Sequence, residues 1–418
     1  MELKGWDRIW FISARVLSTQ IKEKHMKRSF LLLFALFLLL VIVAVAIYIP
    51  NTLPVVDDFS ALYYADLALV NGIHIYNIPA MEKLALETSG IPPENFFMPR
   101  FPYPPWYVLS TFYLGFLSIE SAGTLWFELN LIILFLSIWF LTDGWDGRLR
   151  LIAFPLGLFF LPVIGALSVG QYDFPVLLGT SMLIYSLRKE NISLTTFGAI
   201  LLTFKPHVGA LILLSVLVWL IVSRSDFGRR VLRAVILSGA FLFVIGFLAD
   251  PAWIVNYPKM LLNYQGEGNV SSCSECANIP VFVSRWLLDG SLSNAAILAL
   301  ILFSILTGLF FAQRKMLMQS PELLLTSTLL ITLLASPYLY NYDFILLLVP
   351  FAVLATGNRM QKLRVLVCHL VPTFALAVFG RAGNITLLVA TLLITLLIFL
   401  RTKSQVDVPA VTAYNTNT

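Results

Sequence analysis

Charged side chains are scarce in this sequence. Asp, Glu, Lys and Arg together make up 12% of its 418 residues, while hydrophobic residues make up 59%. A soluble globular domain carries about 25% charged residues. This deficit and the many long apolar runs exclude an ordinary soluble domain. The composition therefore predicts an all-α polytopic membrane protein.

Cysteine is scarce as well, and three residues are too few for a disulfide framework. Cys273 and Cys276 form a C-S-E-C motif in a polar segment, whereas Cys368 lies in an apolar run and is expected to be buried. Without a second C-x-x-C motif or a nearby His pair, a zinc site is not expected. A local disulfide between Cys273 and Cys276 stays open, because it depends on the side of the membrane on which this segment lies.

Nucleotide-binding motifs are missing. The sequence has no P-loop, no G-x-G-x-x-G in a βαβ context and no Asp-x-Asp motif for a metal-bound nucleotide sugar. We therefore expect neither a metal ion nor a nucleotide cofactor. The formal net charge of +5 is explained below by membrane topology, so nucleic acid is not an expected partner.

Apolar runs predict twelve transmembrane segments within a single domain, residues 30–400. They cover 30–48, 122–141, 150–168, 172–187, 192–204, 207–222, 231–248, 292–312, 322–336, 343–356, 365–380 and 385–400. The first is interpreted as a retained helix, because its apolar run is too long for a signal peptide. A basic tail, 1–29, and a flexible polar tail, 401–418, are both expected in the cytoplasm.

The apolar segment from Trp106 to Leu117 decides the topology. If it lies in the membrane interface, 22 of the 28 Lys and Arg residues fall in the cytoplasm, as the positive-inside rule favours. The six on the outer face are Lys83, Arg100, Lys205, Lys259, Arg285 and Arg381. We therefore expect an inner-membrane, multi-pass protein with two large outer loops, 49–121 and 249–291. The polar side chains that could do chemistry collect on the outer, extracytoplasmic face.

The first outer loop begins with two adjacent acids, Asp57 and Asp58. The following apolar spacing predicts a short amphipathic helix at the membrane surface, from Asp58 to Asn71, ended by Gly72. At least one of the acids could simply cap this helix. Two adjacent acids exceed what a cap needs, however, and one of them could serve as a general base.

Asp66 interrupts the apolar face of the same predicted helix. It could be a second site residue, but we expect it to reach the lipid headgroups. Further along the loop, Tyr103-Pro104-Pro105 places two prolines where a helix begins, which the structural preference of proline explains by itself.

Other polar residues fall at the ends of predicted spans on the outer face. They include Gln171, Asp173, Lys205, His207 and Asp343. Ionisable groups inside spans are costly and indicate function, although residues at span ends can also extend to water. In contrast, His369 lies in the middle of a predicted span, where hydrogen bonding between helices is its expected role.

A set of short motifs resembles a known family. In order, these are Asp58-Phe59, Tyr63-Tyr64, Gly72, Tyr76, Tyr103-Pro104-Pro105, Gly170-Gln171, Lys205-Pro206 and Ser336-Pro337. The chain resembles the GT-C superfamily of membrane glycosyltransferases, and most closely glycosyltransferase family 87, the polyprenyl-phosphate-mannose-dependent mannosyltransferases. Each motif alone is weak, but the ordered set is moderately specific.

The resemblance implies a GT-C helical bundle in which an aspartate of the first outer loop is the catalytic base. Asp58 fits that position because Phe59 follows it, and Asp57 stays the alternative. The implied donor is a sugar on a polyprenyl phosphate, transferred with inversion to a hydroxyl of a lipid, polysaccharide or protein acceptor. The side chains expected to hold the leaving phosphate or the substrates are Lys205, His207, Arg381, Gln171, Tyr63, Tyr103, Asp343 and Arg100.

Two other function classes remain open at this stage. A twelve-helix transporter or lipid flippase would need no covalent chemistry, but such proteins usually show two related halves, which are not evident here. A non-enzymatic membrane scaffold would not explain the ionisable groups at the span ends.

Overall fold

The structure is a computed structural model. It describes residues 57–406 apart from 90–91, 93–95, 97, 265–275, 289–290 and 337–338. The predicted first span, 30–48, Cys273 and the two tails up to residue 56 and after residue 406 therefore lie outside the described residues. Within them the chain is all-helical, as predicted, with a single isolated β-bridge between Cys276 and Tyr340.

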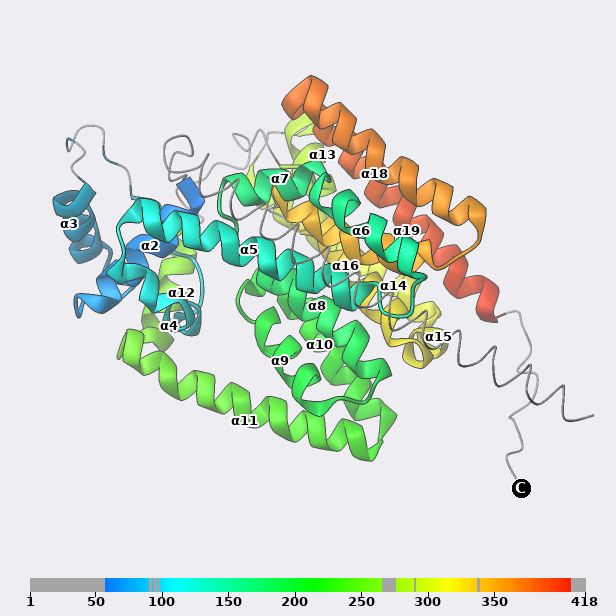
Figure 1. Cartoon of the computed structure of the whole chain (residues 1–418), viewed down its shortest axis with the longest axis horizontal. Coiled ribbons are helices and arrows are strands. Elements are labelled where there is room, and N and C mark those ends of the chain that lie inside the picture. Colours follow the sequence, from blue (N-terminus) through cyan, green and yellow to red (C-terminus); the bar gives the residue numbers. More distant parts are fainter. Residues whose placement is uncertain are drawn as a thin grey trace, which may run out of the picture.

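Short helices form one end of the molecule (Figure 1). They are α2 (Asp57–Val70), α3 (Ile78–Ser89), α4 (Pro105–Thr111), the 3₁₀ helix η2 (Phe112–Phe116) and α12 (Trp253–Tyr264). Their apolar side chains share one hydrophobic cluster, to which Trp126 of the neighbouring helix also belongs. The first outer loop is thus a packed structural unit with its own core.

Helix α2 differs from the predicted amphipathic surface helix. Its limits agree with the prediction, and Gly72 follows it with φ +72°, the left-handed conformation that glycine adopts without strain. However, Phe59 to Ala68 are all buried, so the helix is enclosed by protein on every side. Asp66 is 0% exposed, and the expectation that it reaches the lipid headgroups is wrong.

α2 is buried because the segment that we expected to lie in the membrane interface packs against it. Trp106 to Leu117 forms α4 and η2, and both are too short to cross a membrane. η2 packs directly on α2: a Cβ on Gly115 would lie 2.5 Å from the backbone oxygen of Asp66. Phe112 and Phe116 of η2 are exposed, so this segment presents the apolar outer surface that was expected of α2.

The remaining helices form the rest of the molecule. They are α5 (Ile119–Leu141), α6 (Gly147–Leu158), α7 (Leu161–Ser168), α8 (Asp173–Arg188), α9 (Ile192–Leu202), α10 (Pro206–Ser223), α11 (Asp226–Ala249), α13 (Ile279–Leu287), α14 (Leu292–Ala312), α15 (Arg314–Gln319), α16 (Pro321–Ala335), η4 (Asn341–Leu347), α17 (Leu348–Ala355), α18 (Arg359–Phe379), η5 (Gly380–Gly383) and α19 (Asn384–Val406). α8 and α16 are buried along nearly their whole length. The other long helices surround these two.

Every predicted span after the first falls on one or two helices: 150–168 is divided between α6 and α7, and 343–356 between η4 and α17. Not every helix is long enough to span a membrane. Five helical stretches are long and apolar enough: α5, α10, α11, most of α14, and the run Arg359–Arg401 that contains α18 and α19. The bent pair of α6 and α7, at 54° to each other, would make a sixth. The remaining predicted spans match shorter helices, which are tolerated at membrane depth where protein encloses them. The chain is thus a helical membrane protein, whereas its twelve crossings and its sidedness remain predictions.

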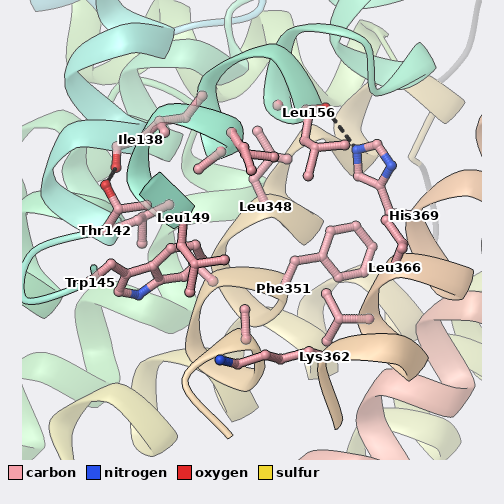
Figure 2. Close-up of a pocket in the computed structure, with 17 residues that line it drawn as sticks. Ile138, Thr142, Trp145, Leu149, Leu156, Leu348, Phe351, Lys362, Leu366 and His369 are labelled. Atoms are coloured by element: carbon pink, nitrogen blue, oxygen red, sulfur yellow. Dashed lines mark hydrogen bonds between the residues drawn. The ribbon is translucent and has the colours of Figure 1, made fainter. Parts of the chain in front are cut away.

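A cavity of about 220 Å³ lies between α5, α6, α17 and α18 (Figure 2). Its walls are almost entirely apolar. Lys362 and His369, both from α18, are among the lining residues, and His369 Nε2 lies 2.8 Å from the carbonyl oxygen of Leu156. The expected role of His369 in bonding two helices together is therefore confirmed. Cys368 beside it is buried and free, also as predicted.

Paired glycines allow α8 and α9 to approach each other closely. A Cβ on Gly179 would lie 2.7 Å from the carbonyl oxygen of Gly198, and a Cβ on Gly198 would lie 2.9 Å from that of Gly179. Small residues at helix contacts are typical of membrane proteins, where close backbone packing drives association.

We predict that Gly179→Ala lowers the stability of the protein by about 1–3 kcal/mol, the range for overpacked cores. The measurement is the thermal unfolding temperature of the purified protein in detergent. Gly239→Ala in α11 is the control, because a Cβ there has no atom within 4 Å. That variant should unfold at the same or a slightly higher temperature, since alanine favours helix by about 1 kcal/mol over glycine. An equal loss in both variants would contradict the proposed contact.

Candidate active site

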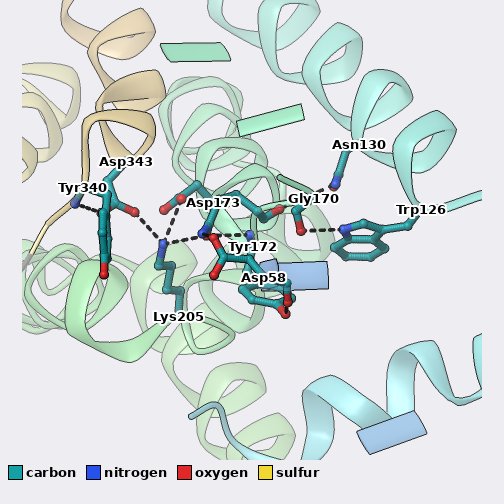
Figure 3. Close-up of polar contacts among 10 residues, drawn as sticks. Asp58, Trp126, Asn130, Gly170, Tyr172, Asp173, Lys205, Tyr340 and Asp343 are labelled. Carbon is teal, nitrogen blue, oxygen red and sulfur yellow. Dashed lines mark hydrogen bonds and ion pairs between the residues drawn. The ribbon is translucent and has the colours of Figure 1, made fainter. Parts of the chain in front are cut away.

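Asp58 lies in the first turn of α2, and its side chain is half-buried. Its Oδ2 atom accepts a hydrogen bond of 2.5 Å from Gln171 Nε2. The Tyr172 hydroxyl donates to its backbone carbonyl, and the Tyr342 side chain also hydrogen-bonds to its carboxyl group. Asp58 is therefore half-buried, and its position is fixed from the turn before α8 and from η4. Figure 3 shows Asp58 beside Tyr172 and the Lys205 network.

The turn from α7 to α8 holds the start of α2 in place. Gly170 adopts φ +68°, and a Cβ there would lie 2.7 Å from the Cβ of Phe59, so only glycine permits this approach. The Phe59 amide donates to the Val169 carbonyl at 3.2 Å, and Trp126 Nε1 donates to the Gly170 carbonyl at 2.8 Å. The Gly170-Gln171 motif thus combines a required backbone conformation with the side chain that binds Asp58.

Behind Gln171, Lys205 is the centre of a buried polar network. Its Nζ atom donates to Gln171 Oε1 at 3.3 Å, to Asp173 Oδ2 at 2.8 Å and to Asp343 Oδ1 at 2.5 Å. A lysine ammonium has three donors, so all of them are used. Lys205, Asp173 and Asp343 are each at most 2% exposed, and their charges are therefore shielded little by water.

Asp343 connects the network to the 3₁₀ helix η4. Its second oxygen, Oδ2, accepts from the Tyr340 amide at 2.6 Å and so caps η4. The second outer loop reaches the same segment: Ala277 donates from its amide to the Leu339 carbonyl at 3.3 Å, and Asn278 Nδ2 donates to the same oxygen. Cys276, which precedes them, is disulfide-bonded. Both large outer loops therefore meet at this site.

Electrostatics suit Asp58 to a role as a base. Burial raises the pKa of its carboxyl group above the usual value for aspartate, and the hydrogen bond from Gln171 and the charge of Lys205 oppose part of that rise. A half-exposed carboxylate with a moderately raised pKa accepts a proton from a hydroxyl better than an ordinary aspartate does.

Three of the expected site residues meet Asp58 directly or through the network: Gln171, Lys205 and Asp343. Two tyrosines take part in packing. The Tyr63 hydroxyl donates to the Leu117 carbonyl at 3.0 Å, and the Tyr103 ring lies 4.6 Å from that of Tyr172, centroid to centroid.

The other residues expected to hold the phosphate or substrates lie at exposed or half-buried positions. His207 is exposed, two residues after Lys205 in the first turn of α10. Arg381 is exposed in η5, and a 3.4 Å hydrogen bond between Asn341 and Asn384 holds this end of α18 and α19 beside η4. Arg100 is half-buried in the segment before α4. Asp57 opens α2, but its side chain lies outside what the structure describes.

Sequence reasoning underrated three residues of the site. Asp173 was noted but not placed beside Lys205, and the roles of Tyr172 and Tyr342 were not anticipated. All three stand next to expected positions, in G-Q-Y-D and in Y-N-Y-D. The sequence signal for these three residues is their place: they belong to polar motifs at the start of helices that are buried.

Two chemical features complete the description. Asp66 accepts a hydrogen bond of 3.1 Å from Thr111 Oγ1 in the core between α2 and α4, which gives it a structural position. Among the described residues, no three His, Cys, Asp or Glu side chains are grouped to hold a metal ion.

Comparison with known proteins gives the family. The sequence model described as glycosyltransferase family 87 matches residues 101–337, more than half of the chain. The matched region includes Gln171, Lys205 and Asp173, whereas Asp58 precedes it. No curated protein and no solved structure matches the chain significantly. The match confirms the resemblance read from the motifs, and the all-helical fold is consistent with the GT-C superfamily: this chain belongs to glycosyltransferase family 87.

Proposed function

We propose that this glycosyltransferase moves a sugar, mannose, from a polyprenyl-phosphate donor to a hydroxyl of a lipid, polysaccharide or protein acceptor. The observation that supports it most is the half-exposed Asp58 carboxylate, held by Gln171 against a buried lysine–aspartate network. Because family 87 gives only the reaction class, the donor, the sugar and the base belong to this proposal.

In the proposed step, Asp58 takes the proton of the acceptor hydroxyl. The acceptor oxygen then forms a bond to the anomeric carbon of the donor, on the face opposite the phosphate. The bond between that carbon and the phosphate oxygen breaks, and its electron pair leaves with the lipid phosphate. One displacement inverts the configuration at the anomeric carbon.

The leaving phosphate needs positive charge or hydrogen-bond donors. Lys205 is already paired with two carboxylates, so we assign it the role of positioning Gln171 and thereby Asp58. His207 and Arg381, which are both exposed, are the proposed contacts for the phosphate. Arg100, Tyr63 and Tyr103 remain proposed substrate contacts along the first outer loop, and Asp57 remains the alternative base.

We place this site on the extracytoplasmic face of the inner membrane. The disulfide at Cys276 supports that assignment, because disulfides persist in oxidising compartments. The distribution of Lys and Arg supports it independently. The alternative of a transporter or flippase without covalent chemistry is not favoured, since the family match points to sugar transfer.

We predict that Asp58→Asn lowers the transfer rate by about 10²–10⁴-fold, the usual contribution of a general base. Asparagine can still accept the hydrogen bond from Gln171, so the fold should be kept. The measurement uses purified protein, radiolabelled polyprenyl-phosphate mannose and a total lipid extract from the host.

Asp226→Asn is the control for this experiment. Asp226 is an exposed acid at the start of α11, paired with Arg229, and its loss should leave transfer unchanged. Full activity of Asp58→Asn would exclude Asp58 as the base and turn attention to Asp57.

We predict that transfer falls at acid pH as Asp58 becomes protonated. Because the pKa of Asp58 is raised in the folded protein, kcat/KM should fall at a pH above the usual aspartate value of about 3.9. Gln171→Met removes a hydrogen bond that lowers this pKa, so the acid limb should move to higher pH. A pH–rate profile of both proteins checks this, and an unmoved limb would contradict the contact.

We predict that Lys205→Met destabilises the protein by about 3–5 kcal/mol, because it leaves two buried carboxylates without their cation. Asp173→Asn should cost much less, since it leaves a neutral pair of Lys205 and Asp343. Thermal unfolding in detergent measures both. Equal stability of the two variants would show that Lys205 does not hold the network together.

A further inference from the structure

We infer that the cavity between α5, α6, α17 and α18 is a lipid site, separate from the catalytic one, that holds one acyl chain of an anionic phospholipid. In this site Lys362 contacts the phosphate of the lipid. The inference rests on the lining of the cavity, its opening, the charge around it and its place in the fold.

The lining favours an apolar guest over water. The cavity measures about 220 Å³, far more than the ~10–15 Å³ that a single water needs. Of the polar groups in its wall, Thr142 Oγ1 donates to the Ile138 carbonyl at 2.6 Å and His369 Nε2 bonds to Leu156, whereas His369 Nδ1 is buried without a hydrogen-bond partner among the described residues. A water inside would find few partners, and apolar cavities of this kind take up apolar molecules.

The opening faces outward between helices. Leu149 and Ile152 of α6 and Leu366 of α18 line the cavity and are exposed. Exposed apolar residues on a membrane helix face lipid chains. A chain can therefore enter from the side, while Phe351 and Leu348 form the inner wall (Figure 2).

Positive charge is present beside the cavity. Lys362 is exposed and lines it, and the first turns of α6 and α18, the helices that supply this lining, carry the exposed Arg148 and Arg359. The acids at this end are otherwise engaged, since Asp143 pairs with Lys189 at 3.4 Å and Asp146 caps α6 by accepting from the Arg148 amide. Basic residues beside a hydrophobic segment favour anionic headgroups.

The cavity lies at the opposite end of α5 from the candidate active site. Trp126 on α5 bonds to the turn that holds Asp58, whereas Thr142 of the same helix region lines the cavity. Along an α-helix these positions are about 24 Å apart. The bound lipid would thus come from the other leaflet, which the topology prediction places on the cytoplasmic side, where anionic lipids collect.

The first test counts lipids on the purified full-length chain. Native mass spectrometry is run after incubation with equal amounts of phosphatidylglycerol and phosphatidylcholine. We expect one retained phosphatidylglycerol per chain, and about five-fold less of it for Lys362→Gln. Lys315→Gln, an exposed lysine of α15 that does not line the cavity, should retain as much as the unaltered chain. Equal retention of the two lipids, or no effect of Lys362→Gln, overturns the inference.

The second test locates the bound acyl chain by cross-linking. A phosphatidylglycerol with a photoactivatable group near the end of one acyl chain is cross-linked, and the labelled peptides are mapped. We expect label on residues 149–157 and 348–366, and its loss in Ala352→Trp, which fills the cavity. Label spread over α11 and α14, cross-links between two copies of the chain, or displacement by a polyprenyl phosphate would overturn the inference. Both tests read lipid binding, so their failure would leave the proposed transfer reaction untouched.

Discussion

The contact of Lys205 with two carboxylates is the interaction on which the site depends. A buried lysine is costly unless it is paired, and here Asp173, Asp343 and Gln171 take its three donors. Lys205 directly precedes α10, and its partners come from the turn before α8, the start of α8 and the start of η4, so one ammonium group connects three helix beginnings. Asp58 is joined to this centre through Gln171, and Tyr342 of η4 also bonds to its carboxyl group. The accessible carboxylate is therefore positioned by groups that water does not reach.

Much of the fold follows from the sequence, because apolar runs and helix breaks are local signals. The turn at Gly170, the break at Lys205-Pro206 and the end of α2 at Gly72 were all predicted. Long-range pairing was not, since Lys205 and Asp343 are 138 residues apart in the chain and no spacing rule connects them. Asp66 was expected to reach the lipid headgroups from a surface helix. It is buried because Thr111 bonds to its side chain and Gly115 packs against its backbone. Several of the twelve predicted spans match helices too short to cross a membrane. The local apolar pattern alone does not give the number of crossings.

The two ends of the bundle differ in the side chains that they carry. At one end, short helices and turns bring together ionisable groups and aromatic rings, among them Tyr103 and Tyr172. At the other end the helices are joined by basic loops, and α6 and α18 leave an apolar cavity between them. The buried helices α8 and α16 run between the two ends and keep them at a fixed separation.

The position of the site in turns between helices has a consequence for anyone who alters this protein. The turns 169–172 and 203–205 and the segment 339–343 each supply a backbone or side-chain contact, so an inserted residue there would displace the Asp58 carboxylate. The connections at the other end carry no such contacts to Asp58. Affinity tags, fluorescent reporters or antibody epitopes are therefore best inserted in the connections 224–225 and 356–358. Added residues there leave the positions of the site residues unchanged.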